Sequence, residues 1–465
     1  MLIKPTRREA YRLLHDGALA LARAERQGIR VDMEYCQSKH DHLTRKIALL
    51  EKRFFETSFY RHWYNSFGGR VNINSNDQLA TFLYDKKKIK PTTLTESGKG
   101  STDEDALLQL DIPELVDLLQ IRKLKKVRDT YLGAFMREQV DGFIHPFYNL
   151  HLVKTFRSSS DSPNFQNIPK RDKEAMLLTR RALFPRVGHQ LMEVDFKGIE
   201  VRIAACYHKD PTMLRYIKDP TTDMHGDMAV QLFGLSNFTK SNPAHSTLRS
   251  AAKNSFVFPQ FYGDYYKNSA INLAIVWGKL PDHGNWRKGQ GLPLEDGFAL
   301  GDLMLSNGFK NLDDYIEHVR VIEDDFWTKR FPIYSKWKEQ WIAEYKKKGY
   351  FDMFTGFRCS GVLRPNNIIN YPVQGVAFHC LLWALIRLDY LFSLQNLQSK
   401  IIGQIHDAIV FDIYPPELVR VSKLIKQVMT QELVEHWRWI IVPMDVEVDL
   451  GEIDASWADL SFYKI

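Results

Sequence analysis

Two aspartates stand where the chain changes direction, which is where a carboxylate can point into a cleft. Asp195 ends a strand-like stretch that a Lys-Gly turn separates from a helix. Asp407 lies at the tip of a predicted hairpin over residues 400–413, with apolar residues close on both sides. Capping of the helix by Asp195 and an ordinary turn role for Asp407 stay open as alternatives. The apolar surroundings favour a functional Asp407.

A pair of cations follows on a predicted helix that begins at about Thr247. Arg249 and Lys253 are four residues apart and share one helix face, which suits a clamp for a triphosphate. A pair at this spacing is more often surface decoration, so the spacing alone does not assign it.

Basic and amide-rich segments suit a polyanionic partner. The formal net charge is +7, and lysine and arginine gather in residues 85–90 and 122–128. Such clusters neutralise phosphates or form a solvated helix face, and both interpretations stay open. Residues 155–169 surround Arg157 with hydroxyls and amides, which can donate to a nucleic-acid backbone or minor groove.

Hydrophobic periodicity predicts the elements that position these groups. Long amphipathic helices are expected over residues 35–64 and 102–140, forming a projecting arm, and over 324–348. Residues 440–450 alternate acidic and apolar residues, as an edge strand with one wet face does. A helix over 11–27 ends at Gly28. Its apolar face is predicted to consist of Leu13, Leu14, Ala18, Leu21 and Ala22.

The bulk properties are those of an ordinary globular protein. Of the 465 residues, 44% are hydrophobic and 26% are charged. The cysteines form no CxxC pair, so neither a zinc site nor a disulfide framework is indicated, and a reducing compartment is expected. The amino terminus lacks an apolar signal region, and no apolar run is expected to span a bilayer. These features predict a soluble intracellular protein without a membrane partner.

Several of these segments occur in an order that resembles the polymerase core of family A DNA polymerases. This is the bacterial DNA polymerase I family, and the phage-encoded branch is the most similar. The resemblance runs from about Leu13 to Trp457. Residues 195–202 match the family's Asp-Tyr-Ser-Gln-Ile-Glu-Leu-Arg motif, and residues 155–169 match its Thr-Gly-Arg segment without gaps. The other matching positions are Arg249, Lys253, Phe258, Tyr262, Gly263, residues 370–375, His406, Asp407 and the later hairpin acid Asp412.

The chain departs from the family pattern in three places. Lys197-Gly198 replaces the usual pair after the first acid and its aromatic neighbour. One extra residue separates Lys253 from Phe258, so a gapless alignment would put Val257 at the aromatic position. We prefer Phe258, because its four-residue spacing to Tyr262 is kept. Ala408 stands where most members carry an accessory glutamate, which affects metal positioning more than the chemistry itself.

The resemblance implies an α+β right-hand polymerase fold with an antiparallel palm sheet, helical fingers and a thumb of long helices. The implied division is a helix packing on the palm at 1–34, a thumb at 35–140, a first palm part at 141–232, fingers at 233–348 and a second palm part at 349–465.

The resemblance also implies site roles. Asp195, Asp407 and the backbone carbonyl of Phe196 would hold two Mg²⁺ ions, with Mn²⁺ able to substitute. Two such carboxylates about 4 Å apart would repel by roughly 4 kcal/mol without a cation between them. Lys253 would also act in catalysis as a proton donor. The implied nucleotide-binding residues are Arg249, Lys253, His225, Phe258, Tyr262 and the sugar-excluding Glu200, and the implied DNA-binding residues are Arg157, Asn164, Gln166, Asn167, Arg202, Gln374, Gln404, His406, Lys125 and Lys126.

The expected partners are primer-template DNA and deoxynucleoside triphosphates, in the cytoplasm, or in the host cytoplasm if the protein is phage-encoded. We expect no exonuclease domain here, so an exonuclease, like a helicase or processivity factor, would be a separate partner. Asp445 and Glu447 mimic an exonuclease acid pair but fall on the final palm strand and are interpreted as structural. Alternative functions are a single-subunit RNA polymerase relative and a non-catalytic DNA-binding homologue.

Overall fold

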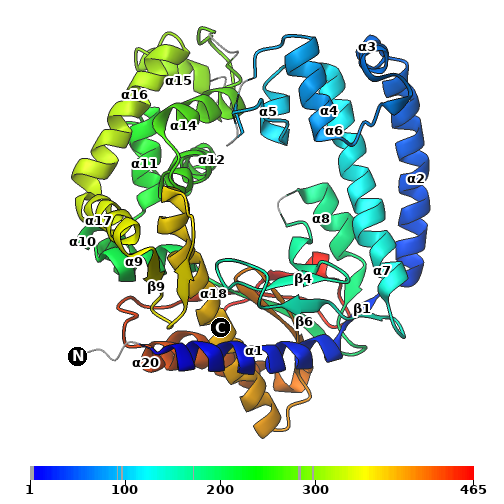
Figure 1. Cartoon of the computed structure of the whole chain (residues 1–465), viewed down its shortest axis with the longest axis vertical. Coiled ribbons are helices and arrows are strands. Elements are labelled where there is room, and N and C mark those ends of the chain that lie inside the picture. Colours follow the sequence, from blue (N-terminus) through cyan, green and yellow to red (C-terminus); the bar gives the residue numbers. More distant parts are fainter. Residues whose placement is uncertain (1–4, 92, 96–97, 171, 281–283, 296–297) are drawn as a thin grey trace. The chain divides into compact units, whose positions relative to one another are not determined.

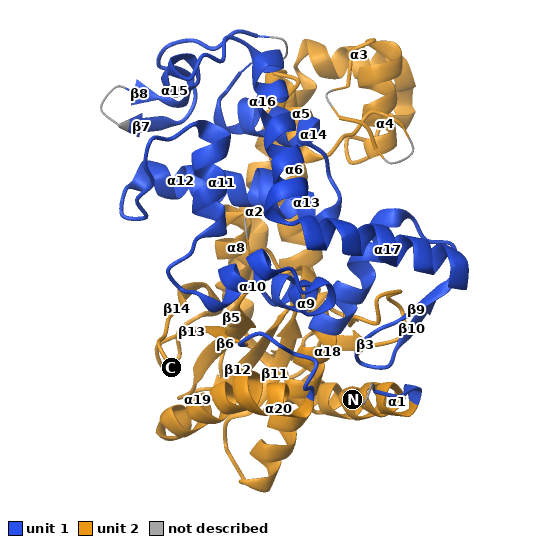
Figure 2. Cartoon of the chain, turned by 90° about the vertical axis from the view of Figure 1, so that its left-hand side faces the viewer, with its two compact units in different colours: residues 1–7, 198–377, 437–443 blue, residues 8–197, 378–436, 444–465 orange. Residues whose placement is uncertain are grey.

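The computed structural model describes residues 5–465 except 92, 96–97, 171, 281–283 and 296–297. The chain divides into two compact units, each assembled from separate stretches (Figure 2). Unit 1 comprises Met1–Arg7, Gly198–Ala377 and Trp437–Pro443, and unit 2 comprises Arg8–Lys197, Phe378–His436 and Met444–Ile465. The five-part division predicted from the sequence remains a prediction.

Unit 2 is built on a five-stranded antiparallel sheet with the order β11-β12-β6-β13-β14. Strands β6 and β12 are almost wholly buried, which explains their near-continuous apolar sequences. The prediction of an edge strand over residues 440–450 is wrong. Strand β13 starts only at Val446 and lies between β6 and β14. The strands are β6 Gln190–Phe196, β11 Lys400–Ile405, β12 Ala408–Ile413, β13 Val446–Leu450 and β14 Ser461–Phe462.

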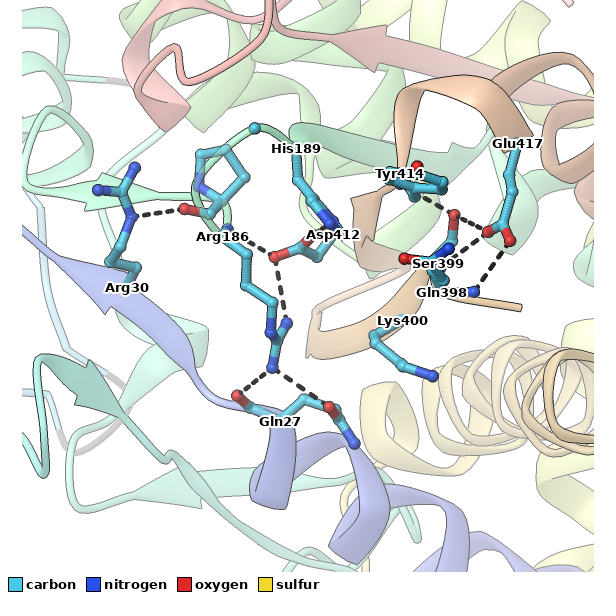
Figure 3. A network of polar contacts seen from close by, with 12 residues as sticks. Gln27, Arg30, Arg186, His189, Gln398, Ser399, Lys400, Asp412, Tyr414 and Glu417 are labelled. Atoms are coloured by element: carbon cyan, nitrogen blue, oxygen red, sulfur yellow. Dashed lines mark hydrogen bonds and ion pairs between the residues drawn. The ribbon is translucent and has the colours of Figure 1, made fainter. Parts of the chain in front are cut away.

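Polar contacts fasten the end of the β11–β12 hairpin that lies away from its tip (Figure 3). Asp412, only 2% exposed, accepts hydrogen bonds from the backbone N–H and the guanidinium of Arg186 and is paired with His189. Glu417 accepts from the backbone N–H groups of Gln398 and Ser399. Asp412 therefore fastens the open end of the hairpin, and its partners offset the cost of burying a carboxylate.

Two antiparallel rods of helix lie side by side in unit 2 (Figure 1). One is α2, Met33–Phe55, and the other runs through α6, Pro113–Lys125, the π-helical turn η3, Lys126–Leu132, and α7, Gly133–Glu138. Their facing leucine and isoleucine side chains are buried, as the amphipathic pattern predicts. Both predicted helices are shorter than expected, because the first breaks before Thr57, the N-cap of α3, and the second before Pro113.

Helix α1, Arg7–Gln27, ends at Gly28, whose φ of +66° terminates the helix as predicted. Its buried face differs from the predicted one. Gly17, Ala20 and Ala24 are buried with Leu13 and Leu21, whereas Ala18 and Ala22 are exposed. The helix packs closely at this face, since a Cβ on Gly17 would lie only 2.8 Å from the Leu382 side chain.

The remaining elements of unit 2 are short. Its helices are α3 Ser58–Phe67, α4 Asn76–Ala80, α5 Glu104–Leu108, α8 Lys173–Arg180, α19 Leu418–Lys426 and α20 Leu433–His436. Its smaller sheets pair β1 Ile29–Val31 with β2 Phe143–Ile144 and β5 Leu183–Phe184, and β3 Phe147–Asn149 with β4 Ser159–Asp161.

Unit 1 is mainly helical. Its predicted helix at Thr247 starts earlier, as α12, Pro243–Ala252, because Asn242 caps it and Pro243 occupies its first turn. The predicted helix at 324–348 is broken before Pro332 by the π-helical turn η7, Phe326–Arg330. The other elements are α9 Ile199–His208, α10 Pro211–Lys218, α11 Met224–Phe233, η5 Lys253–Val257, α13 Phe258–Tyr262, α14 Tyr266–Asn272, α15 Leu300–Ser306, α16 Leu312–Asp325, α17 Pro332–Lys348 and strands β7 Pro293–Glu295, β8 Phe298–Ala299, β9 Tyr350–Asp352 and β10 Arg358–Ser360.

One long helix, α18, Pro365–Leu394, belongs partly to each unit. By length and apolar composition it could cross a membrane, so the expectation that no run is long enough was wrong. However, 72% of its most apolar window is buried inside the structure, as in a core helix. The four cysteines are buried free thiols.

Candidate active site

The pairing of β6 with β12 brings the two candidate acids together, Asp195 on β6 and Asp407 in the turn just before β12. Asp195 of β6 lies directly opposite Ala408, the first residue of β12. Asp407 is therefore next to it across the strand pair, and the Phe196 N–H donates to the Asp407 carbonyl at 3.4 Å. The tip is tight because His406 adopts a φ of +51°. Long-range strand pairing thus places both carboxylates at one end of the sheet.

The acids lie in a mixed electrostatic environment. Burial raises the pKa of Asp195 to about 7, and the carboxylates of Asp407, Glu193 and Glu447 add to the rise against the ammonium of Lys170. The Asp407 carboxylate pairs with Arg157, whose guanidinium Nη2 lies 3.2 Å from Oδ1. The side chains of Asp195 and Asp407 are 40% and 27% exposed, so both are open to a ligand.

The donor set fits a hard divalent cation that is completed by a substrate. Carboxylate and carbonyl oxygens are the ligands Mg²⁺ prefers. The carboxylates around Asp195 add to the rise in its pKa that burial causes, and a bound cation would offset both effects. Among the described residues, no group of three or more His, Cys, Asp or Glu side chains could hold a metal alone. Mg²⁺ sites built from one or two carboxylates together with substrate phosphates have this character.

A buried charge network under Asp195 escaped the sequence analysis. Glu193, two residues earlier on the same face of β6, is 3% exposed and accepts from Arg180 and the indole of Trp457, both at 2.9 Å. Lys170 contacts Glu193 at 2.9 Å and lies 3.9 Å from Asp195. Burial opposes ionisation of Glu193, but these donors hold its pKa below the usual value. The period-two spacing of the two acids was the available signal.

The amide-rich segment is tied to the hairpin by its own side chains. Gln404 is 1% exposed and accepts hydrogen bonds from Ser158 and from Gln166, both at 2.7 Å. It therefore orients this segment instead of presenting a free amide, whereas Asn164 and Asn167 of the same segment are exposed. The predicted residues Arg157, Asn164, Gln166, Asn167, Gln404 and His406 all belong to unit 2.

Only part of the predicted basic cluster faces open space. A cavity of about 750 Å³ within unit 2 is lined by Lys126, Asn167, Lys170 and His406, among other residues. Lys125 instead pairs with Glu51 of α2 at 2.6 Å. Its neighbours Arg122 and Lys123 line the cavity but also have protein partners, Asn76 of α4 and Glu174 of α8. Much of this cluster is therefore engaged with other parts of unit 2.

Unit 1 gathers the predicted cations around one histidine. Arg249 donates to Asp223 at 2.7 Å, and the Lys253 ammonium lies 5.2 Å from the centre of the Phe258 ring. The His225 ring meets Phe258 edge-on at 5.8 Å. Burial and then the charges of Arg249 and Lys253 lower the pKa of His225 to about 4. His225 is therefore neutral near pH 7 and can donate a hydrogen bond without adding charge.

The extra residue in this region is contained in a wider helical turn. Residues Lys253–Val257 form the π-helical turn η5, in which the Phe258 N–H reaches back five residues to Lys253. The turn absorbs one residue without ending the helix. Val257 is fully buried and Phe258 is partly exposed, so only Phe258 can offer a face to a ligand.

A tyrosine and a glutamate of unit 1 are joined by a hydrogen bond. The Tyr262 hydroxyl donates to the carboxylate of Glu200, in the first turn of α9. The amide of Asn370, on α18, donates to the Tyr262 carbonyl at 3.1 Å, and Gln374 lies one turn further along the same helix, partly exposed. Arg202 donates to the Pro443 carbonyl, which ties α9 to the segment Trp437–Pro443.

The sequence of the chain is similar to those of known DNA polymerases. The family model described as DNA polymerase family A matches residues 33–276 and 321–459. DNA polymerase I of Lactococcus lactis is 27% identical over 450 residues, covering 94% of this chain and 44% of the relative. The thermostable DNA polymerase I of Thermus thermophilus is 28% identical over 449 residues, covering 93% and 46%. The chain thus spans less than half the length of these curated relatives.

A solved structure is similar across nearly the whole chain. It is the POL domain of Pol1 from M. smegmatis in complex with DNA primer-template and dNTP, with a TM-score of 0.71 and 23% identity, covering 96% of this chain and 70% of that one. At this identity the likeness shows the fold. The α+β right-hand polymerase fold expected from the sequence is confirmed.

Proposed function

Because the chain belongs to DNA polymerase family A, we propose that it is a DNA-directed DNA polymerase. It would extend a primer 3′-hydroxyl with deoxynucleotides, by attack on the α-phosphate and release of pyrophosphate. The observation that carries the proposal is the meeting of Asp195 and Asp407 across the β6–β12 pair. The two acids lie far apart in the sequence but meet at one end of the sheet, where both could bind the metal ions that phosphoryl transfer uses.

Asp195, Asp407 and the Phe196 carbonyl are the proposed metal ligands. Two Mg²⁺ ions, which Mn²⁺ can replace, would stabilise the attacking and leaving oxygens when bound. Arg157, paired with Asp407 in this structure, keeps that carboxylate oriented toward the site.

The unit 1 cluster would bind the triphosphate. Arg249 and Lys253 supply the charge, and the neutral His225 supplies a hydrogen bond. Lys253 would also give a proton to the departing pyrophosphate. The faces of Phe258 and Tyr262, four residues apart on one helix, would stack on the new base pair.

The primer-template would lie along the unit 2 cavity. Lys126 and His406 line this cavity, and the exposed amides of Asn164 and Asn167 are available for a minor groove. Arg202 and Gln374 belong to unit 1 and would contact DNA from there. Gln404 and Lys125 act indirectly in this proposal, because both are engaged with protein partners.

Labelled primer-template tests this function directly. Incubation with Mg²⁺ and deoxynucleotides should lengthen the primer, and incubation without nucleotides should leave it intact, since we propose that residues 1–465 carry the polymerase core alone. Extension with ribonucleotides instead would favour the RNA polymerase alternative, and binding without extension would favour a non-catalytic homologue. We further propose the phage-encoded branch, a cytoplasmic location, and a separate exonuclease, helicase or processivity factor as partners.

Replacing Glu200 should relax sugar selection. The carboxylate held by Tyr262 would fill the space that a ribose 2′-hydroxyl needs. Glu200→Ala is expected to raise ribonucleotide insertion relative to deoxynucleotide insertion by about tenfold or more in kcat/KM. Tyr262→Phe, which removes only the hydroxyl, is the matched control for the hydrogen bond. Unchanged sugar selectivity in Glu200→Ala would contradict the gate.

Metal binding by the free protein should depend on pH. Asp195 has a pKa raised to about 7, so its carboxylate is charged above that pH and protonated below it. The Mn²⁺ dissociation constant is therefore expected to increase about tenfold between pH 8 and pH 6. Titration followed by the electron paramagnetic resonance signal of free Mn²⁺ measures it. The Asp195→Asn variant should lose this dependence, and a flat wild-type profile would contradict the assignment.

A further inference from the structure

Lys170 places an ammonium beside the candidate metal site. It follows residues 155–169 directly and is absent from the motif that they match. Its Nζ lies 2.9 Å from Glu193 Oε1 and 3.9 Å from Asp195 Oδ2. The Lys170 ammonium is thus within ion-pair distance of Asp195. It therefore holds the position from which a positive charge acts on that carboxylate.

Glu193 has two further donors besides Lys170. Arg180, 5% exposed, and the Trp457 indole both donate to Glu193 Oε2. The Arg180 guanidinium is itself held over the Trp457 ring at 4.4 Å. These two donors are fixed, whereas the Lys170 side chain is 56% exposed. When Lys170 leaves, Glu193 Oε1 loses its hydrogen bond, but Arg180 still pairs the charge of the buried carboxylate.

An alternative partner for the ammonium lies on its open side. Lys170 lines the same 750 Å³ cavity as Lys126 and His406, which is the proposed path of the primer-template. A DNA phosphate there would compete with Asp195 for the lysine. The lysine is long and flexible enough to reach either acceptor.

We propose that Lys170 is a displaceable counter-ion for Asp195. It neutralises the carboxylate in the free protein and turns to a primer-template phosphate when DNA is bound, which releases Asp195 to the metal. The inference rests on the proposed function. Its consequence is a coupling between DNA and metal binding that must be reciprocal, each ligand raising the affinity for the other. Lys170 is thus a positioning residue that acts through Asp195.

The test compares Mn²⁺ affinities of full-length variants by electron paramagnetic resonance, with and without saturating primer-template and without nucleotides. At about pH 8.5, above the pKa of Asp195, Lys170→Met should tighten Mn²⁺ binding to the free protein about fivefold, the scale of a partly exposed charge pair. With DNA bound, its affinity should equal that of the wild type. Lys170→Arg keeps the charge and should restore wild-type behaviour. Lys173→Met is the matched control, because this substitution removes the same charge from a nearby residue. Lys173 is exposed on the first turn of α8.

Each contrary outcome is distinct. Equal Mn²⁺ affinity of free wild type and free Lys170→Met would overturn the counter-ion role, and an undiminished difference on DNA would overturn its displacement. An equal effect of Lys173→Met would reduce the role to general charge and also overturn it. If Asp195→Asn binds Mn²⁺ as the wild type does, the metal assignment of the proposed function fails, independently of Lys170.

Discussion

Asp195→Asn and Asp407→Asn should each reduce Mg²⁺-dependent primer extension by at least about a thousandfold, because a metal ligand contributes several kcal/mol to the transition state. Each change removes one negative charge and keeps the shape of the side chain. Backbone pairing holds β6, which carries Asp195, and the β11–β12 hairpin, whose turn carries Asp407, so the fold is retained. Single-turnover extension on a labelled primer measures the loss, and primer-template binding should stay within about threefold.

The control for this pair lies on the same sheet. Glu447 faces Asp195 from the opposite neighbour, β13, and its carboxylate contributes to the raised pKa of Asp195. Glu447→Gln therefore removes a neighbouring acid that has no proposed metal role, and extension should change by less than about fivefold. Substantial extension by either aspartate variant, or a loss in Glu447→Gln as large as theirs, would contradict the assignment of the two acids.

Lys253→Met should lower the rate of nucleotide addition by about a hundredfold to ten-thousandfold, because it removes both a charge on the triphosphate and the proton donor. Lys253→Arg restores the charge but not an efficient acid, since a guanidinium does not give up its proton. The arginine variant should therefore recover nucleotide affinity while its maximal rate stays low. The dependence of single-turnover rate on nucleotide concentration separates the two effects.

Lys240 offers the matched control for the second prediction. It contacts Asp223 at 3.3 Å, in the same acid–base cluster as Arg249, but its side chain is 62% exposed. Lys240→Met should therefore change the rate of addition by less than about fivefold. A full rate in Lys253→Arg would show that charge alone matters and that another group supplies the proton.

The two helical rods show how much of the structure hydrophobic periodicity can predict. Apolar spacing predicted both rods correctly as helices, but Thr57 and Pro113 broke them into shorter pieces. Periodicity could not show which basic residues of the second rod are paired, because the partner, Glu51, lies far away in the sequence. Lys125 is occupied by Glu51, while Lys126, the next residue, faces a cavity. Adjacent lysines differ because their side chains leave the helix about 100° apart.

What the sequence determined by itself is local. Residue order and spacing placed Asp195 at the end of a strand, Asp407 in a tight turn, and Arg249 and Lys253 on one face of a helix. Such features depend on neighbours within a few residues, and periodicity and turn chemistry record them directly.

Tertiary structure alone decided the rest. The β6–β12 pairing brought the two acids together, and folding buried Gln404 and surrounded Glu193 with Arg180, Trp457 and Lys170. It also absorbed the residue before Phe258 in a π-helical turn. Burial, partner choice and pKa depend on groups distant in the chain, because hydrogen bonds and Coulomb forces act through space and not along the sequence.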